Sequence, residues 1–271
     1  MDIAALFNND EVSTTRVTNV TAICANKFIS AYVITPEQAV TRAPLIAIHG
    51  ISRNAEEILE QFRPEAAATP RVIIVPTFDQ DTWPVFQRIT NRHRPDLALL
   101  AVLNTLRERQ VINRQRVDLF GFSGGAQLAH RFAMLFPELV DELHLGAAGW
   151  YTLPQPNLPY PLGVGVSSSK NNWHRLMQSS LLRFLNRRIQ VYVGKDDVSQ
   201  DQALRQDSLL NRVQGDTRVE RAERYVDLVG REQARIGFPF KAQLRLLENC
   251  AHDFKQCCTE GGMIEMMRTA Q

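Results

Sequence analysis

Apolar residues in this chain gather in short, unbroken runs that end at Gly, Pro or a polar residue. Runs of this length without polar alternation are typical of β-strands buried on both faces of a sheet. The segments that separate several of the runs have apolar residues at helical spacing instead. Alternating strands and helices predict a mostly parallel sheet that is covered by helices on both sides. The expected strands lie at 44–50, 71–76, 116–121, 141–149, 189–194 and 243–248, and the expected helices at 55–62, 95–109 and 126–135.

The chain before these runs follows a different pattern. Residues 14–23 and 27–36 are rich in β-branched and aromatic side chains and are joined by a short turn, which predicts two antiparallel strands. Residues 151–188 begin rich in Pro and Gly and end in a helical pattern, so we expect an excursion above the sheet rather than a separate domain. We therefore expect one α/β domain that spans residues 1–271.

Residues 202–237 predict one long or two shorter amphipathic helices, with Gly215 and Gly230 as possible breaks. Arginines in this segment alternate with Asp and Glu, and we interpret them as a solvated face. The formal charge of +2 gives no electrostatic reason to expect a nucleic-acid or membrane partner. The N-terminal residues lack the apolar core of a secretory signal, so we expect a cytoplasmic protein with reduced cysteines.

The sequence GFSGG, at 121–125, joins an expected strand to an expected helix with almost no loop between them. It fits the pattern Gly-x-Ser-x-Gly, in which small residues permit a sharp turn that lifts a serine hydroxyl above the sheet. Ser123 is therefore the candidate nucleophile. A serine hydroxyl needs a general base, which is itself oriented by an acid.

In this architecture the acid and then the histidine follow the serine along the chain. His252 comes directly after the last expected strand, where a loop can bring its ring to Ser123. His174 lies inside the excursion, ahead of any well-placed acid, and is the weaker candidate for the base. Asp196 and Asp197 follow the strand at 189–194, and the spacing from Gly194 favours Asp197.

Acyl transfer also needs two backbone N–H groups that bind the developing oxyanion. Gly124, directly after the serine, is expected to supply one of them. The loop after the strand at 44–50 is expected to supply the other, from Ile51 or, second, from Ser52. His49 precedes the serine and is expected to brace this loop rather than act as the base.

The segments HGISRNAEE, GFSGGAQ and AAGWYTLP, which begin at residues 49, 121 and 147, resemble the polyhydroxybutyrate-depolymerase-like esterases of the α/β-hydrolase superfamily. The resemblance covers nearly the whole chain. It implies an α/β-hydrolase fold with an eight-stranded, mostly parallel sheet and an ester-cleaving triad at Ser123, His252 and Asp197. It also implies a lid after the sixth strand, where the excursion falls. Many polyester-cleaving relatives are exported, so the missing signal argues against a polymeric substrate.

Four aromatic residues are candidate walls of the substrate pocket: Phe122, Trp150, Tyr151 and Trp83. Trp150 and Tyr151 open the excursion and are expected to overhang the serine. The cysteines near His252 match no common zinc spacing, so neither a metal nor a cofactor is expected.

The sequence thus predicts a serine esterase whose partner is a small or medium-sized ester. It leaves the oligomeric state open. The alternatives are a peptidase or thioesterase with the same triad, or an inactive binding protein with a hydrolase fold.

Overall fold

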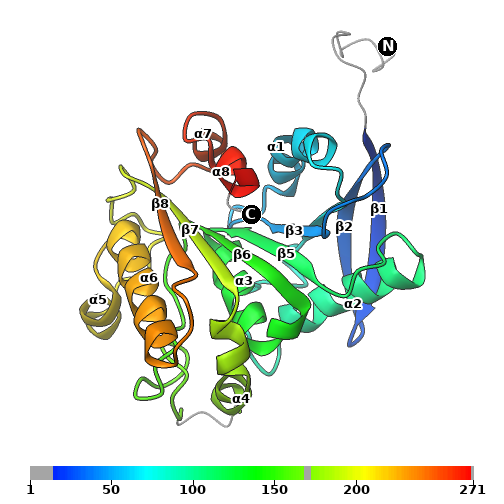
Figure 1. Cartoon of the computed structure of the whole chain (residues 1–271). Coiled ribbons are helices and arrows are strands. Elements are labelled where there is room, and N and C mark those ends of the chain that lie inside the picture. Colours follow the sequence, from blue (N-terminus) through cyan, green and yellow to red (C-terminus); the bar gives the residue numbers. More distant parts are fainter. Residues whose placement is uncertain (1–14, 168–171, 270–271) are drawn as a thin grey trace.

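A computed structural model describes residues 15–167 and 172–269. The centre of the molecule is an eight-stranded sheet in the order β1-β2-β4-β3-β5-β6-β7-β8 (Figure 1). The strands from β3 to β8 run parallel, whereas β2 runs antiparallel to both β1 and β4. This confirms the two predicted antiparallel strands and the predicted parallel sheet. The strands are β1 (Thr15–Cys24), β2 (Lys27–Pro36), β3 (Leu45–Ile48), β4 (Ile73–Thr77), β5 (Val117–Phe122), β6 (Val140–Gly146), β7 (Arg188–Gly194) and β8 (Ala242–Leu247).

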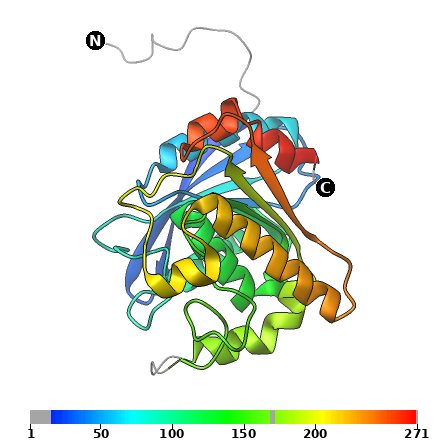
Figure 2. The same ribbon diagram turned by 90° about the vertical axis from the view of Figure 1, so that its left-hand side faces the viewer.

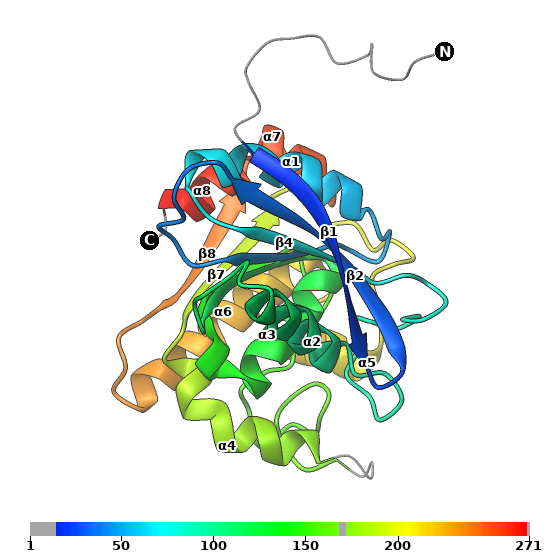
Figure 3. The ribbon, with the colours of Figure 1, turned by 90° about the vertical axis from the view of Figure 1, so that its right-hand side faces the viewer.

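Helices cover both faces of this sheet, and the central strands are therefore buried on both sides. One face packs against α2 (Pro95–Glu108), α3 (Gly124–Leu135) and α6 (Arg218–Arg235). The other face packs against α1 (Ala55–Ala68), α7 (Phe254–Thr259) and α8 (Met263–Thr269), seen at the top of Figure 3. The predicted helices at 55–62, 95–109 and 126–135 correspond to α1, α2 and α3.

The excursion after β6 carries α4 (Trp173–Leu185), at the lower edge of the molecule in Figure 2. This helix packs against α3, the 3-10 helix Pro137–Leu139 and α6. The lid expected here would have to cover Ser123. None of the described residues of the excursion lines the cavity beside that serine.

The segment after β7 forms two helices, α5 (Ser208–Gln214) and α6. Gly215 ends α5 with φ of 110°, which confirms one of the two expected breaks. Gly230 lies inside α6 and is not a break. A Cβ at Gly230 would meet the Phe240 ring at 1.8 Å, so the absence of a side chain there serves close packing rather than a turn.

Among the residues described, there is no helix with both the length and the apolar character needed to cross a bilayer. The loops that follow β3, β5, β7 and β8 contribute Ile51, Ser123, Asp197 and His252, respectively. Because these strands are parallel, their carboxyl ends lie at the same edge of the sheet, which brings these four residues to one side of the molecule.

Candidate active site

Ser123 occupies a sharp turn between β5 and α3. Its φ and ψ are 52° and −113°, a left-handed conformation that non-glycine residues rarely adopt. The turn is tight enough that a Cβ on Gly121 would lie 2.3 Å from backbone atoms of Gly125. A Cβ on Gly125 would likewise lie 2.3 Å from the Ile48 carbonyl oxygen. Gly121 and Gly125 are therefore required by the close approach of β3, β5 and α3.

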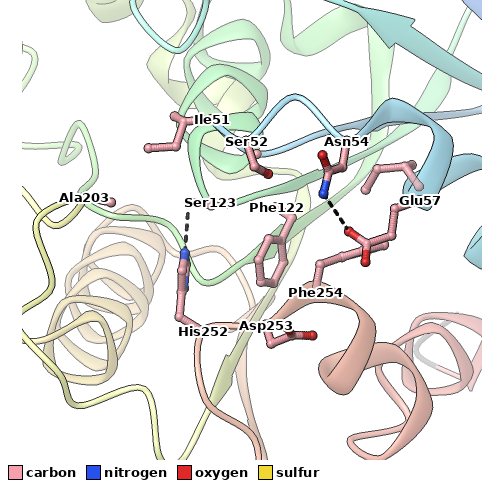
Figure 4. A pocket seen from close by; sticks show the side chains of 12 residues that line it. Ile51, Ser52, Asn54, Glu57, Phe122, Ser123, Ala203, His252, Asp253 and Phe254 are labelled. Carbon is pink, nitrogen blue, oxygen red and sulfur yellow. Dashed lines mark hydrogen bonds between the residues drawn. The ribbon is translucent and has the colours of Figure 1, made fainter.

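The Ser123 hydroxyl contacts the imidazole of His252, as Figure 4 shows. Oγ of Ser123 lies 3.1 Å from Nε2 of His252, and Nδ1 of the same ring lies 2.8 Å from Oδ2 of Asp197. Because Nδ1 donates to the carboxylate, Nε2 is left to accept the hydroxyl proton. The structure thus brings Ser123, His252 and Asp197 into one chain of hydrogen bonds. Asp196 is exposed and takes no part in it.

A buried arginine supports the acid of this chain. Nη1 of Arg218 lies 3.1 Å from Oδ1 of Asp197 and 2.8 Å from Oδ2 of Asp201. The side chains of Arg218 and Asp197 are 1% and 0% exposed. A buried carboxylate requires a compensating charge, and this guanidinium provides it on the side of Asp197 that faces away from His252.

The interpretation of the α6 arginines as a solvated face is wrong for Arg218 and Arg221, which are both buried. Arg221 donates to the Gly149 carbonyl oxygen and to Asn211. A signal was present in the sequence, because these arginines lie at helical spacing with the buried Tyr225 and Val229. Charge alternation along the chain concealed which face of the helix they occupy.

The loop after β3 lies directly opposite the start of α3. A Cβ on Gly124 would lie 3.4 Å from the backbone nitrogen of Ile51, so the two peptide units face each other beside Ser123. Gly124 is the first residue of α3, where N–H groups have no partner within the helix. Within the described part of the chain, the Ile51 N–H makes no hydrogen bond. Both N–H groups are thus available to an oxygen atom at the serine.

His49 holds this loop in place, in agreement with the sequence analysis. Its Nδ1 donates to the Gly50 carbonyl oxygen at 2.8 Å, and its Nε2 accepts from the Phe78 N–H at 3.1 Å. Burial lowers the pKa of His49 to about 4, so the ring is neutral at physiological pH. The imidazole therefore joins the loops after β3 and β4 without adding charge to the site.

A cavity of about 330 Å³ opens beside Ser123. Phe122 lines it, as the sequence predicts, and stacks on the His252 ring with centroids 5.3 Å apart. The other walls come from the loop after β3, the start of α1 and the segment around His252. They are Gly50, Ile51, Ser52, Asn54, Glu57, Ile58, Ser123, Ala203, His252, Asp253 and Phe254.

The structure does not bring the other three predicted wall residues to this cavity. Trp83 is buried, and its Nε1 donates to the Phe28 carbonyl oxygen in β2. Tyr151 is fully buried and stacks on Tyr225 of α6 at 4.1 Å. Trp150 lines a different cavity. An aromatic residue just after a strand can pack to either side of the chain, and in these three cases packing directs it away from the serine.

A search of models of known protein families finds no match to this chain, and neither does a search of curated protein sequences. Solved structures do match. Poly(aspartic acid) hydrolase-1 from Sphingomonas sp. KT-1 is 18% identical with a TM-score of 0.75, and the match covers 93% of this chain and 97% of the hydrolase. A poly(3-hydroxybutyrate) depolymerase from Bordetella parapertussis is 23% identical with a TM-score of 0.76, over 94% of this chain and 88% of the depolymerase.

An S-formylglutathione hydrolase from Agrobacterium tumefaciens is 14% identical with a TM-score of 0.63, over 96% of each chain. These identities are low, so the matches establish the fold and not the reaction. The chain adopts the α/β-hydrolase fold, as its sequence predicts, and it is similar in structure to esterases and other serine hydrolases.

Proposed function

We propose that this protein is a serine hydrolase that cleaves a carboxylic ester of a small or medium-sized substrate. The observation that carries the proposal is the hydrogen-bonded chain from Ser123 through His252 to Asp197, with distances of 3.1 and 2.8 Å. A serine–histidine–acid chain of this kind generates a nucleophile from an otherwise unreactive hydroxyl. The α/β-hydrolase fold and the hydrolases among the structural neighbours support the same reaction class.

In the first half of the reaction, Oγ of Ser123 attacks the ester carbonyl carbon while Nε2 of His252 takes the hydroxyl proton. The carbonyl oxygen becomes an oxyanion, which the N–H groups of Gly124 and Ile51 bind. Asp197 holds the imidazole in the required tautomer and stabilises its cation. The tetrahedral species then collapses: the bond to the alcohol oxygen breaks, and His252 passes its proton to the leaving alcohol.

The second half releases the acid. A water molecule attacks the acyl-serine carbonyl carbon, and His252 takes a proton from that water. The bond between carbon and Oγ breaks, the proton returns to Oγ, and the carboxylic acid departs. Arg218 is a positioning residue in both halves, because it binds Oδ1 of Asp197 and leaves Oδ2 to His252.

The cavity supports a substrate of limited size. Its volume of about 330 Å³ lies near the lower end of the range of small-molecule sites. Some structural neighbours are named for polymeric substrates and two for S-formylglutathione. A thioester is therefore the main competing substrate class, since the same attack and proton transfers cleave it.

Labelling with a fluorophosphonate probe tests the nucleophile. The native protein should form one covalent adduct at Ser123, detected by mass spectrometry, and the Ser123→Ala variant should form none. An unlabelled, folded native protein would contradict the proposal and favour a binding protein with a hydrolase fold. Rates for an ester, a thioester and an amide of one acyl group then separate esterase, thioesterase and peptidase.

A further inference from the structure

A second cavity, of about 220 Å³, lies near the first and is lined by residues from five parts of the fold. Arg88 comes from the loop after β4, Arg131 from α3, Trp150 from the segment that follows β6, Tyr160 from the excursion and Arg205 from the loop after β7. The proposed ester hydrolysis uses none of these residues. Three guanidinium groups around one small cavity require an explanation, because like charges repel.

Arg131 is the unusual member of this group, because it is 1% exposed and all of its hydrogen-bond acceptors are neutral. Its Nε donates to Oγ1 of Thr152 at 3.0 Å, and its Nη1 donates to the carbonyl oxygens of Gln87 at 2.7 Å and Gln127 at 3.1 Å. Its Nη2 is buried and has no hydrogen-bond partner in the described part of the chain. A buried guanidinium without a carboxylate is costly, and Nη2 is the one nitrogen of Arg131 that has no acceptor among the described residues.

The side chains around Arg131 carry further positive charge. The guanidinium carbons of Arg131 and Arg205 lie 4.2 and 5.3 Å from the centre of the Trp150 ring. Burial, together with the positive charges of Arg88 and Arg205, lowers the pKa of Arg131 to about 10. Asp207 pairs with Arg205 at 2.8 Å, whereas Arg88 forms no ion pair with any described residue. The cavity therefore has an excess of positive charge.

The second cavity is adjacent to the serine. Arg131 follows Ser123 by two helical turns on α3, which corresponds to about 12 Å along the helix axis. Gln87 lies between the two sites: its carbonyl oxygen accepts from Arg131, and its Cβ would lie 3.5 Å from a Cβ on Gly124. Ala203 lines the first cavity, and Arg205 lines the second.

We propose that the second cavity binds a carboxylate of the substrate, so that the preferred ester carries a carboxylate remote from the bond that Ser123 cleaves. The inference rests on the proposed ester hydrolysis for its role in turnover. Because Nε and Nη1 of Arg131 already donate to neutral acceptors, Nη2 alone can donate to the carboxylate, through a charge-assisted hydrogen bond. The apolar walls, Ile89 and Trp150 among them, suit a carboxylate at the end of a hydrocarbon chain.

Mono-4-nitrophenyl esters of α,ω-dicarboxylic acids of increasing length test this proposal, each compared with the same compound capped as a methyl ester. At the length that spans the two cavities, kcat/KM for the free acid should exceed that for the capped compound by about 10- to 100-fold, the worth of a hydrogen-bonded charge pair. Equal rates at every length, with the capped esters turned over, would overturn the inference and leave the proposed function intact.

Substitutions locate the effect. Arg131→Met should abolish the preference for the free acid. Because Arg131 also braces α3, the double variant Arg88→Gln/Arg205→Gln at more exposed positions provides an independent test, and it should lower the preference by about tenfold. Arg92→Gln is the matched control, since Arg92 is exposed on the same loop as Arg88 and does not line the cavity. An equal loss of preference in Arg92→Gln would contradict the assignment.

A binding measurement separates this inference from the esterase proposal. Calorimetry with the Ser123→Ala variant and a dicarboxylate monoamide of the preferred length should show binding that is lost when Arg131→Met is added. If the monoamide binds but the native protein does not hydrolyse the esters, only the proposed function is contradicted. If the esters are hydrolysed but the monoamide does not bind, only the carboxylate site is contradicted.

Discussion

Two histidines of this protein, one on a loop at the edge of the sheet and one within a strand, have similar partners and very different surroundings. His252, with Ser123, Asp197 and Arg218, forms what we call the edge cluster, at the carboxyl ends of the strands. His144 of β6 forms the sheet cluster: its Nδ1 lies 3.0 Å from Oη of Tyr192, and its Nε2 lies 4.0 Å from a carboxylate oxygen of Glu142. Each cluster combines an imidazole, a hydroxyl and a carboxylate.

The two clusters differ in access to solvent and in charge compensation. The His252 side chain is 20% exposed and borders a cavity, whereas the His144 side chain is 1% exposed within the sheet. Burial lowers the pKa of His144 to about 3 and raises the pKa of Glu142 to about 7. Both carboxylate oxygens of Glu142 lack hydrogen-bond partners in the described chain, and its nearest cation, Arg188, is 3.5 Å away.

This difference shows what a reactive histidine requires beyond a hydroxyl and an acid nearby. A ring in the middle of a strand is held between neighbouring strands and helices, where no substrate can reach it. A ring on a loop at the end of a strand can face a cavity while Arg218 pairs with its acid from the opposite side. His144 also follows Ser123 in the chain, so position in the sequence alone does not separate the two.

Removal of the nucleophile should give the largest contrast between the clusters. Ser123→Ala should lower kcat for a 4-nitrophenyl ester by about 10⁶, the loss seen when serine proteases lose their nucleophile. Tyr192→Phe removes the hydroxyl of the sheet cluster and should keep kcat within about twofold, since that hydroxyl is closed off from substrate. Steady-state kinetics, with circular dichroism to verify folding, would measure both. Half-normal activity in Ser123→Ala would show that the nucleophile lies elsewhere.

Neutralising the acid should have the next largest effect. Asp197→Asn should lower kcat by about 10⁴, as in serine proteases, because an amide favours the wrong imidazole tautomer. Asp196→Asn alters an exposed neighbour and should change kcat by less than about twofold. If kcat fell by similar factors in the two variants, the assignment of Asp197 rather than Asp196 as the acid would be contradicted.

Loss of the arginine behind the acid should act on stability as well as on rate. Arg218→Met leaves the buried Asp197 carboxylate without its cation, so we expect a loss of about 3–5 kcal/mol in the free energy of unfolding. Urea denaturation would measure it, and kcat should fall because Asp197 is no longer fixed. Arg224→Met is the control, because Arg224 is exposed on the same helix. If Arg218→Met matched this control in stability, the guanidinium would not compensate the buried charge.

The sheet cluster should make the free energy of unfolding depend on pH. The pKa of Glu142 is about 7 in the folded protein and about 4.3 in the unfolded chain, so the folded state binds this proton more tightly. Its contribution to stability is therefore complete below pH 4 and is lost as pH rises towards 7.

In the Glu142→Gln variant the side chain is a neutral amide, which does not titrate between pH 4 and pH 7. The unfolding free energy of this variant relative to the native protein should rise by roughly 3 kcal/mol between pH 4 and pH 7, measured by urea denaturation at several pH values. Glu138→Gln, at an exposed carboxylate just before β6, should show no such change. A constant difference between Glu142→Gln and the native protein across this range would contradict the raised pKa.

The sequence by itself determined the features that depend on local geometry. Uninterrupted apolar runs identify strands buried on both faces, and the spacing of glycines around Ser123 allows only a sharp turn between β5 and α3. The order of serine, acid and histidine then follows from the chain, since loops after parallel strands meet at one edge. These inferences need no knowledge of which helix face packs inward.

Only the tertiary structure decided which side chains lie beside one another across the fold. Trp150 and Tyr151 are adjacent in the chain, yet one lines the second cavity and the other packs on α6. Arg131 and Arg218 look like surface charges in the sequence and are buried, with partners up to 44 residues away in the chain. The free energy of such a group depends on the partners that its burial supplies, and those partners exist only once distant segments have packed together.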